Sequence, residues 1–502
     1  MYLGLDLGTS ELKALLLDKD HRIVALARAA LSVNRPAPLW SEQAPVQWWE
    51  ALETVMSALH RSSAHAMAAV RAIGLSGQMH GAVAIDAAGE VLRPAILWND
   101  GRSAAQCEAL MASVPRLTAI AGNLAMPGFT APKLLWMKEN EPDLFARTAR
   151  VLLPKDWLRY RLSGTLASDM SDASGTLWLD VGARDWSDEL LMACGLGRHQ
   201  MPSLVEGSAV AGRLKPELAA RWGLTADIPI AGGGGDNAAS AVGMGLVAAG
   251  QGFVSLGTSG VIFVCGDRFA PDPERAVHAF CHALPGRWHQ MSVMLSASSA
   301  VSWAARSFGL GNEASLLAAA ATLNAEARSR APLFLPYLSG ERSPHNDANA
   351  QGVLFGLTHA HGPAEVAYAV VEGVSFGLRD GLDTLDKPSG DLVLVGGGAR
   401  SSWWAQLLAD ILETPLAVCE GGEAGGALGA ARLAWLADGA SEAEVCRRPD
   451  VRQRFEPNPS HSATYVARHA HFKVLYAALR PTFSPTEPSR AKPYPNEVRR
   501  PA

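Results

Sequence analysis

Two distant segments of the chain carry the same short motif, Leu-Gly-Thr-Ser, between two apolar runs. The first motif begins at Leu7 and the second at Leu256. A tight turn between strands presents consecutive backbone N–H groups, and these bind phosphate oxygens together with Thr and Ser hydroxyls. One copy would more often be an ordinary hairpin, but two copies indicate a nucleotide held between two lobes. The residues that we predict to contact this nucleotide are Gly8, Thr9, Ser10 and Lys13 at the first motif and Gly257, Thr258 and Ser259 at the second.

Asp6 interrupts the apolar run that leads into the first turn. A buried carboxylate without a partner is costly. Mg²⁺ is a suitable partner because it uses one or two carboxylates and keeps several waters. An Asp that only caps the turn is the alternative. The second motif has Ser255 at this place, so we predict a single metal site, in which Asp6 holds Mg²⁺ through water.

Asp236 follows four consecutive glycines and precedes a run of small residues at helical spacing. This pattern predicts a loop that runs into the start of a helix, where Asp could act merely as an N-cap. The glycines also allow a ligand to approach the backbone closely. A phosphoryl transfer to a hydroxyl needs a base beside that hydroxyl. We therefore assign Asp236 as the base.

The segment Gly77-Gln78-Met79-His80-Gly81 follows a buried strand predicted over residues 70–76. Ligands bind at the carboxyl ends of strands in α/β sheets. Gln78 and His80 offer donors and acceptors for hydroxyl groups, and Met79 offers an apolar wall. A histidine with a purely structural role is the alternative. We predict that these three side chains bind the substrate.

The elements around these motifs repeat in both halves of the chain. Helical periodicity over residues 45–60 precedes the strand at 70–76, and periodicity over 365–385 precedes a strand at 391–395. The latter strand ends in Gly396-Gly397-Gly398, which we predict to lie against the nucleotide. Alternating strands and helices indicate an α/β fold with two similar domains. The predicted boundaries are 1–243 and 244–480, followed by a Pro-rich, disordered tail at 481–502.

The composition bounds the class of protein. The chain has 502 residues, a net charge of −5 and 48% hydrophobic residues, which suits two domains with sizeable cores. No long basic block is present, so we expect no nucleic-acid partner. The sequence also predicts neither a signal peptide nor a membrane span. Six scattered cysteines favour a reducing cytoplasm.

Several other site types find little support in the sequence. The cluster His278-Ala-Phe-Cys281-His282 contains zinc-ligand types but lacks a second pair at zinc spacing, so we interpret it as part of the core. The chain has no P-loop motif, no G-x-G-x-x-G after the first strand and no G-x-S-x-G elbow. These absences disfavour a P-loop enzyme, a Rossmann dehydrogenase and a serine hydrolase.

Two longer segments resemble the signatures of the FGGY carbohydrate kinases. The first starts at Gly128-Phe-Thr-Ala-Pro-Lys133, and the second runs from Gly352-Val-Leu-Phe-Gly356 to Glu372-Gly373. Within that family the segments most similar to bacterial xylulose kinases include Gly77–His80, Leu153-Pro-Lys-Asp156, Ser168-Asp-Met-Ser-Asp172 and Leu338-Ser-Gly-Glu-Arg342.

The resemblance implies a two-domain fold like that of actin and ribonuclease H, with a catalytic cleft between the domains. It implies transfer of phosphate from ATP, with Mg²⁺, to D-xylulose. It also implies Asp236 as proton acceptor, Asp6 as essential, Met79, His80 and Asn237 at the sugar, and both turns with Gly397 and Gly398 at ATP. A homodimer is left open. The alternatives are a family member that acts on another sugar or polyol, an actin-like ATPase that works by conformational change, and a catalytically dead sugar sensor.

Overall fold

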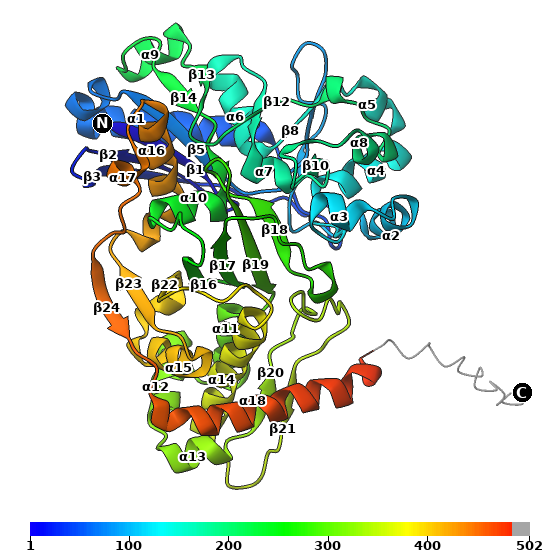
Figure 1. The fold of residues 1–502 in the computed structure, drawn as a ribbon, viewed down its shortest axis with the longest axis vertical. Coiled ribbons are helices and arrows are strands. Elements are labelled where there is room, and N and C mark those ends of the chain that lie inside the picture. The colour runs from blue at the N-terminus through cyan, green and yellow to red at the C-terminus, as the bar shows by residue number, and fades with distance from the viewer. Residues whose placement is uncertain (484–502) are drawn as a thin grey trace, which may run out of the picture.

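Each Leu-Gly-Thr-Ser motif forms the tight turn of an antiparallel hairpin in the computed structural model, which describes residues 1–483. The first hairpin joins β1 (Tyr2–Leu7) to β2 (Glu11–Leu17). The second joins β16 (Gly252–Leu256) to β17 (Gly260–Gly266). Each hairpin lies in a seven-stranded sheet, and each sheet forms the centre of one lobe (Figure 1).

The two sheets share one topology. The first has the order β13-β14-β5-β1-β2-β3, with β15 also paired to β5, and the second has the order β24-β23-β22-β16-β17-β19-β18. Position by position, the pairing is antiparallel, parallel, parallel, antiparallel and antiparallel in both. This confirms the predicted α/β fold with two similar domains. The remaining strands of the sheets are β3 (Ile23–Ala30), β5 (Ala72–Gly77), β13 (Val210–Arg213), β14 (Pro229–Ala231), β15 (Gly234–Gly235), β18 (His278–Cys281), β19 (Trp288–Met294), β22 (Leu392–Val395), β23 (Leu416–Cys419) and β24 (Val451–Phe455).

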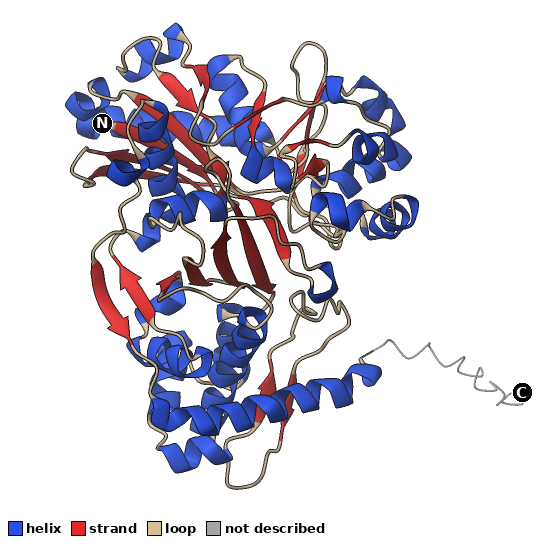
Figure 2. Ribbon diagram, viewed as in Figure 1, coloured by secondary structure: helices blue, strands red, loops and turns tan. Residues whose placement is uncertain are grey.

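Equivalent helices connect equivalent strands in the two lobes, and Figure 2 shows helices in blue around the red strands of both lobes. Helix α1 (Pro45–Ala68) lies between β3 and β5, and α14 (Pro363–Leu382) lies between β19 and β22. Both present one apolar face to their sheet, as Trp48 and Leu52 do in α1 and Val370 and Val374 do in α14. Helix α1 begins at the predicted residue Pro45 but runs to Ala68, beyond the predicted end at 60. Helix α14 begins two residues before the predicted 365, because Pro363 occupies its first position, and it ends at Leu382, before the predicted 385.

The C-terminal half of the chain returns to the first lobe through one helix. Helix α16 (Gly425–Ala437), drawn in orange beside the blue strands in Figure 1, packs on β1 and β5 of the first sheet and on α10 (Asp236–Gly243). A Cβ at Gly74 would lie 1.9 Å from the Ala430 carbonyl oxygen, and one at Gly429 would lie 1.7 Å from the Ala239 oxygen. Backbone therefore touches backbone where α16 crosses α10 and the first sheet. The C-terminal half of the chain thus contributes one helix to the first lobe.

A long excursion between β5 and β14 adds a subdomain to the first lobe, most of which lies at the upper right of Figure 1. Its helices include α4 (Thr130–Asn140), α6 (Pro154–Ser163) and α7 (Met170–Ser174). Its other elements are β6 (Val83–Ile85), β7 (Ala95–Ile96), α2 (Ala104–Ser113), α3 (Leu117–Ala121), α5 (Pro142–Arg147), β8 (Arg150–Leu152), β9 (Ala167–Asp169), β10 (Leu179–Asp180), β11 (Asp185–Trp186), α8 (Asp188–Ala193), β12 (Ser203–Val205) and α9 (Pro216–Trp222).

The second lobe has further helices, most of which pack on the same face of its sheet as α14. They are α11 (Ser298–Ser307), α12 (Glu313–Ala321), α13 (Ala325–Arg330), α15 (Ser402–Leu412) and α18 (Pro459–Leu479). A short 3₁₀ turn, Arg480–Thr482, continues α18, and Phe483 is buried. The described chain extends slightly past the predicted boundary at 480, and the rest of the predicted tail lies outside the described residues. No helix within residues 1–483 is long and apolar enough to cross a bilayer.

The tight packing at Gly74 gives a testable prediction. We expect Gly74→Ala to lower stability by roughly 1–3 kcal/mol, because the added methyl group meets a backbone oxygen that cannot rotate away. The matched control is Gly390→Ala, since a Cβ there meets nothing within 4 Å. Urea unfolding followed by tryptophan fluorescence measures both. Equal stability of the two variants would contradict the backbone contact between α16 and the first sheet.

Candidate active site

One cavity of about 230 Å³ brings together residues that the sequence placed far apart. Met79, His80, Asp236 and Asn237 all line it, together with Ser259 of the second hairpin. The first four were predicted to contact the substrate. The first lobe thus provides the predicted base and sugar-binding residues, and the second lobe provides one wall.

The loop before Asp236 reaches this cavity because it lies directly on strand β5. Gly233 has φ of 81°, and a Cβ there would lie 2.1 Å from the carbonyl oxygen of Leu75. Only glycine fits such an approach in the left-handed region. Helix α10 starts at Asp236 with Gly235 as its N-cap. Asp236 is therefore the first residue of the helix and not its cap.

The environment of Asp236 makes its carboxylate basic. Burial raises its pKa to about 7, and the nearby negative charge of Asp6 acts in the same direction. The backbone N–H and the side-chain Nδ2 of Asn237 donate to Asp236 Oδ1 at 2.7 and 2.8 Å, which opposes the rise. A carboxylate with a pKa near neutrality suits a general base at physiological pH.

Asp6 lies at the end of β1, opposite Lys13 of β2 and next to Ser76 of β5. Burial raises the pKa of Asp6, while the positive charge of Lys13 and the Ser76 hydroxyl oppose the rise. The protein compensates the charge of Asp6 only in part. A hard oxygen ligand in this situation fits a magnesium ion, which would supply the missing positive charge. Lys13 itself pairs with Glu11 at 3.3 Å.

A second cavity, of about 800 Å³, opens in the second lobe. Four predicted nucleotide-binding residues line it: Gly257, Thr258, Gly397 and Gly398. The adjacent Ser259 lines the smaller cavity instead. Consecutive residues of one hairpin therefore face the two cavities. This arrangement would place the phosphate end of a nucleotide close to the predicted base.

The first hairpin holds its neighbours through hydrogen bonds. Thr9 Oγ1 donates to Gln78 Oε1 at 3.1 Å and accepts from Trp98 Nε1 at 2.9 Å. Gln78 is buried and donates to Gln43 Oε1 at 3.0 Å. Within the described residues neither cavity is lined by Gly8, Thr9, Ser10 or Gln78. Gln78 was predicted to bind the sugar. In the structure, its side chain links the segment Gly77–Gly81 to the first hairpin through this hydrogen bond with Thr9.

The imidazole ring of His80 is neutral, and one of its nitrogens is a hydrogen-bond acceptor. Its Nδ1 lies 2.7 Å from the carbonyl oxygen of Gly175, so Nδ1 carries the proton, because a carbonyl only accepts. Burial lowers the pKa of His80 to about 3. The Nε2 atom is then free to accept from a hydroxyl group. The buried Lys133 fixes the loop by donating from Nζ to the His80 oxygen at 2.9 Å and the Gly128 oxygen at 2.8 Å.

Other cavity residues were not assigned as site residues from the sequence. His278, interpreted as core, is buried but lines the cavity, and Asn123 Oδ1 accepts from its Nδ1 at 2.9 Å. Its Nε2 lies 3.4 Å from Arg342 Nη1. Arg342 stands in a family-like segment, which was the only signal for it. The remaining wall residues are Trp98, Met126, Gly128, Phe129, Val261, Phe280, Met291 and Val293.

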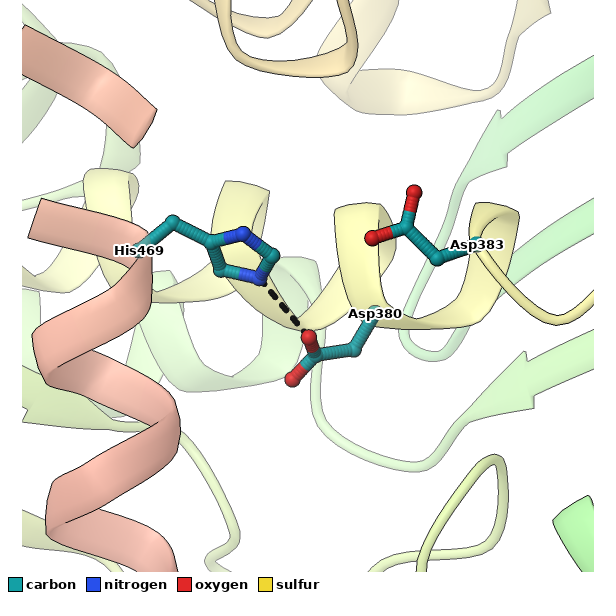
Figure 3. A group of neighbouring side chains, drawn as sticks. All are labelled: Asp380, Asp383 and His469. Atoms are coloured by element: carbon teal, nitrogen blue, oxygen red, sulfur yellow. Dashed lines mark hydrogen bonds and ion pairs between the residues drawn. The ribbon is translucent and has the colours of Figure 1, made fainter. Parts of the chain in front are cut away.

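A separate group of metal-ligand types lies on helices α14 and α18, outside both cavities (Figure 3). Asp380 Oδ1 lies 2.7 Å from Nε2 of His469, and the two side chains point toward one another. Asp383 accepts from Arg379 Nε at 2.8 Å. Each of the three side chains has a protein partner. We therefore interpret the group as a polar contact between helices and not as the magnesium site.

Comparisons with known proteins agree with this geometry. Residues 1–243 match the N-terminal domain of the FGGY family of carbohydrate kinases, and residues 252–437 match its C-terminal domain. A xylulose kinase from Escherichia coli (strain K12) is 53% identical over 96% of this chain and 99% of its own length. The chain belongs to the FGGY family of carbohydrate kinases. Use of ATP follows from this membership.

Solved structures of the family have the same fold. A protein from Brucella ovis described as a xyloylose kinase superposes with a TM-score of 0.92 at 50% identity, covering 96% of this chain and 99% of its own. A gluconate kinase from Lactobacillus acidophilus superposes with a TM-score of 0.89 at 26% identity, covering 96% and 98%. Because proteins named for different sugars share the fold, the fold alone does not define the sugar.

The pKa of Asp236 predicts how activity depends on pH. Only the ionised carboxylate can accept a proton, so kcat/KM should fall about tenfold per pH unit below a midpoint near 7. Initial rates at saturating ATP between pH 5 and 9 measure the profile, with the coupling enzymes checked separately at each pH. An acidic limb with its midpoint near 4, the ordinary value for Asp, would contradict the effect of burial and of Asp6.

Proposed function

We propose that this kinase transfers the γ-phosphoryl group of ATP to the terminal hydroxyl of D-xylulose and forms D-xylulose 5-phosphate. The observation that carries the proposal is the placement of Asp236, with its raised pKa, in a small cavity beside a nucleotide-sized cavity. The sugar is proposed from the E. coli and Brucella relatives, which are about half identical over almost the whole chain. The cytoplasm, where ATP is available, is the proposed compartment.

In the proposed reaction, Asp236 accepts the proton of the attacking hydroxyl as its oxygen bonds to the γ-phosphorus of ATP. The bond from this phosphorus to the oxygen that bridges to ADP breaks in the same displacement. Asn237 keeps the carboxylate oriented through two hydrogen bonds to Oδ1. Oδ2 then remains available to the substrate.

We expect the volume of the cavity and the positions of its polar groups to determine which substrate binds. Its volume of about 230 Å³ suits a small sugar, and its wall mixes apolar side chains with polar groups. His80 and Asn237 offer polar groups to hydroxyls, and Arg342 adds donors on the opposite lobe. Met79 and Phe280 supply apolar surface for the carbon chain.

The nucleotide is proposed to occupy the cavity of the second lobe. Gly397 and Gly398 line this cavity with backbone alone, since they have no side chains. The turn of the second hairpin, which contains Thr258, would face the phosphates. Asp6 would hold Mg²⁺, which supplies neutralisation of phosphate charge when bound. The first hairpin, with Gly8, Thr9 and Ser10, would reach the phosphates from the other lobe when the lobes approach each other.

Two alternatives have a specific basis. A family member acting on another sugar would keep the same base and the same cavities, as the gluconate kinase neighbour illustrates. An actin-like ATPase that works by conformational change would have the same sheets but would hydrolyse ATP without a sugar. The sugar-sized cavity with Asp236 and His80 favours a kinase over the second alternative.

A substrate panel tests the proposal. We expect ADP release by the purified protein to depend on D-xylulose, and to be much slower with ribulose, gluconate, glycerol or no sugar. Coupled assay of ADP and ³¹P NMR of the product measure the rate and the phosphorylated position. A preference for another sugar would change the substrate and keep the mechanism. Equal ADP release with and without sugar would contradict a kinase function altogether.

A further inference from the structure

A buried ion cluster lies directly behind the loop that carries Asp236. Nζ of Lys155 lies 2.6 Å from Asp156 Oδ1, 2.6 Å from Asp169 Oδ1 and 3.1 Å from Asp172 Oδ2. Arg159 adds a second cation, 2.6 Å from Asp156. All five side chains are inaccessible to solvent. We call these residues the Lys155 cluster.

Stability alone does not explain such a cluster. Removing charges from water is expensive, and well-packed apolar residues of similar volume are often as stable or more so. The three carboxylates stand close enough to bind a metal ion, but the Lys155 ammonium group already lies among them. Burial raises the pKa of Asp172 well above its ordinary value. Burial therefore favours the neutral form of Asp172, which reduces the excess of negative charge that three carboxylates have over two cations.

The cluster fixes the start of helix α7. Asp169 is the N-cap of this helix, and its Oδ2 accepts from the backbone N–H of Ser171 at 2.9 Å. The Ser171 hydroxyl donates to the same oxygen at 2.5 Å. Lys155 binds the other oxygen of Asp169. The position of α7 therefore depends on the ion cluster.

Helix α7 and Arg159 contact the loop that carries Asp236, and the C-terminal end of α7 contacts His80. The Gly235 N–H, next to Asp236, donates to Ser171 Oγ at 3.1 Å. Arg159 Nη1 donates to the Gly232 oxygen at 2.6 Å, at the other end of the same loop. Beyond the C-terminal end of α7, the Gly175 oxygen accepts from His80 Nδ1. The base and the sugar-binding histidine are thus attached to opposite ends of one short helix.

We propose that the Lys155 cluster is a positioning device, which uses helix α7 to hold Asp236 and His80 at a fixed separation across the sugar. The inference rests on the proposed role of Asp236 as base. Its members are positioning residues, because none of them lines the cavity of about 230 Å³. Displacement of a base by about 1 Å can cost on the order of 100-fold in rate, so a rigid buried support has a direct effect on catalysis.

Ser171→Ala tests this proposal most selectively. It removes the hydroxyl that joins Asp169 to Gly235 and leaves every charge of the cluster in place. We expect kcat to fall on the order of 10- to 100-fold, with an unchanged KM for ATP, because the nucleotide cavity lies in the other lobe. The matched control is Thr176→Val, since Thr176 is also buried near α7 and its hydroxyl bonds only to local backbone. This control should keep wild-type kcat.

Asp169→Asn provides a second variant, which weakens the ion pair and keeps the side-chain shape. We expect the same loss of kcat with ATP binding retained, and thermal unfolding shows whether each variant is folded. The assay uses the sugar on which the wild-type protein is most active, so failure of the D-xylulose assignment would appear in the wild type and not in this comparison. Wild-type kcat in folded Ser171→Ala, or an equal loss in Thr176→Val, would overturn the proposal.

Discussion

The crossing of α10 and α16 at direct backbone contact determines where the carboxylates of the cleft lie. Helix α10 begins at Asp236, and the first turn of α16 lies against Asp6, since a Cβ at Gly426 would be 2.7 Å from its Oδ1. Glycines at positions such as 243 and 429 allow the helices to approach this closely. Because α10 leads from the first lobe to the second and α16 returns, this contact also connects the lobes. The proposed catalytic groups therefore lie at the junction about which lobe motion would occur.

The ionised carboxylates of Asp6 and Asp236 are both electrostatically unfavourable in their buried positions, and this favours the binding of a cation or a proton there. Each carboxylate is destabilised by burial, and the charge of Asp6 adds to the raised pKa of Asp236. Lys13 offsets part of the charge at Asp6, and Asn237 offsets part at Asp236. The negative charge that remains uncompensated favours binding of a cation at Asp6 and of a proton at Asp236. Active sites often retain such strain where a core would not.

Much of the fold could be predicted from the sequence because it rests on local patterns. The repeated turn, the apolar strands and the glycine runs each predict a local structure, and the repeat indicates two similar domains. Asp236, Met79 and His80, each predicted at the substrate because it follows a glycine-rich strand end, line one cavity in the structure, and Asn237, implied by the family resemblance, lies beside them.

The missing information concerns contacts between distant segments. Nothing local shows that α16 returns to the first lobe, or that the Gln78 side chain turns inward to Gln43 while its neighbours face the cavity. His278 was interpreted as core because it stands in an apolar stretch without a second ligand pair at zinc spacing. It is buried, and only the meeting of the lobes makes it a cavity wall. The Lys155 cluster joins residues from α6, β9 and α7, whose charges alone would suggest a surface. Its burial depends on the packing of the whole subdomain.

The most direct test of the account is the rate of sugar-phosphate formation by Asp236→Asn in a single turnover with ATP prebound. The variant keeps the size of the side chain and an acceptor for Asn237, and loses only the ability to take a proton. The account predicts a rate lower by roughly 10²- to 10⁴-fold, with the Kd for ATP unchanged. A rate close to that of the wild type would show that Asp236 is not the base, and the proposed mechanism would then be wrong.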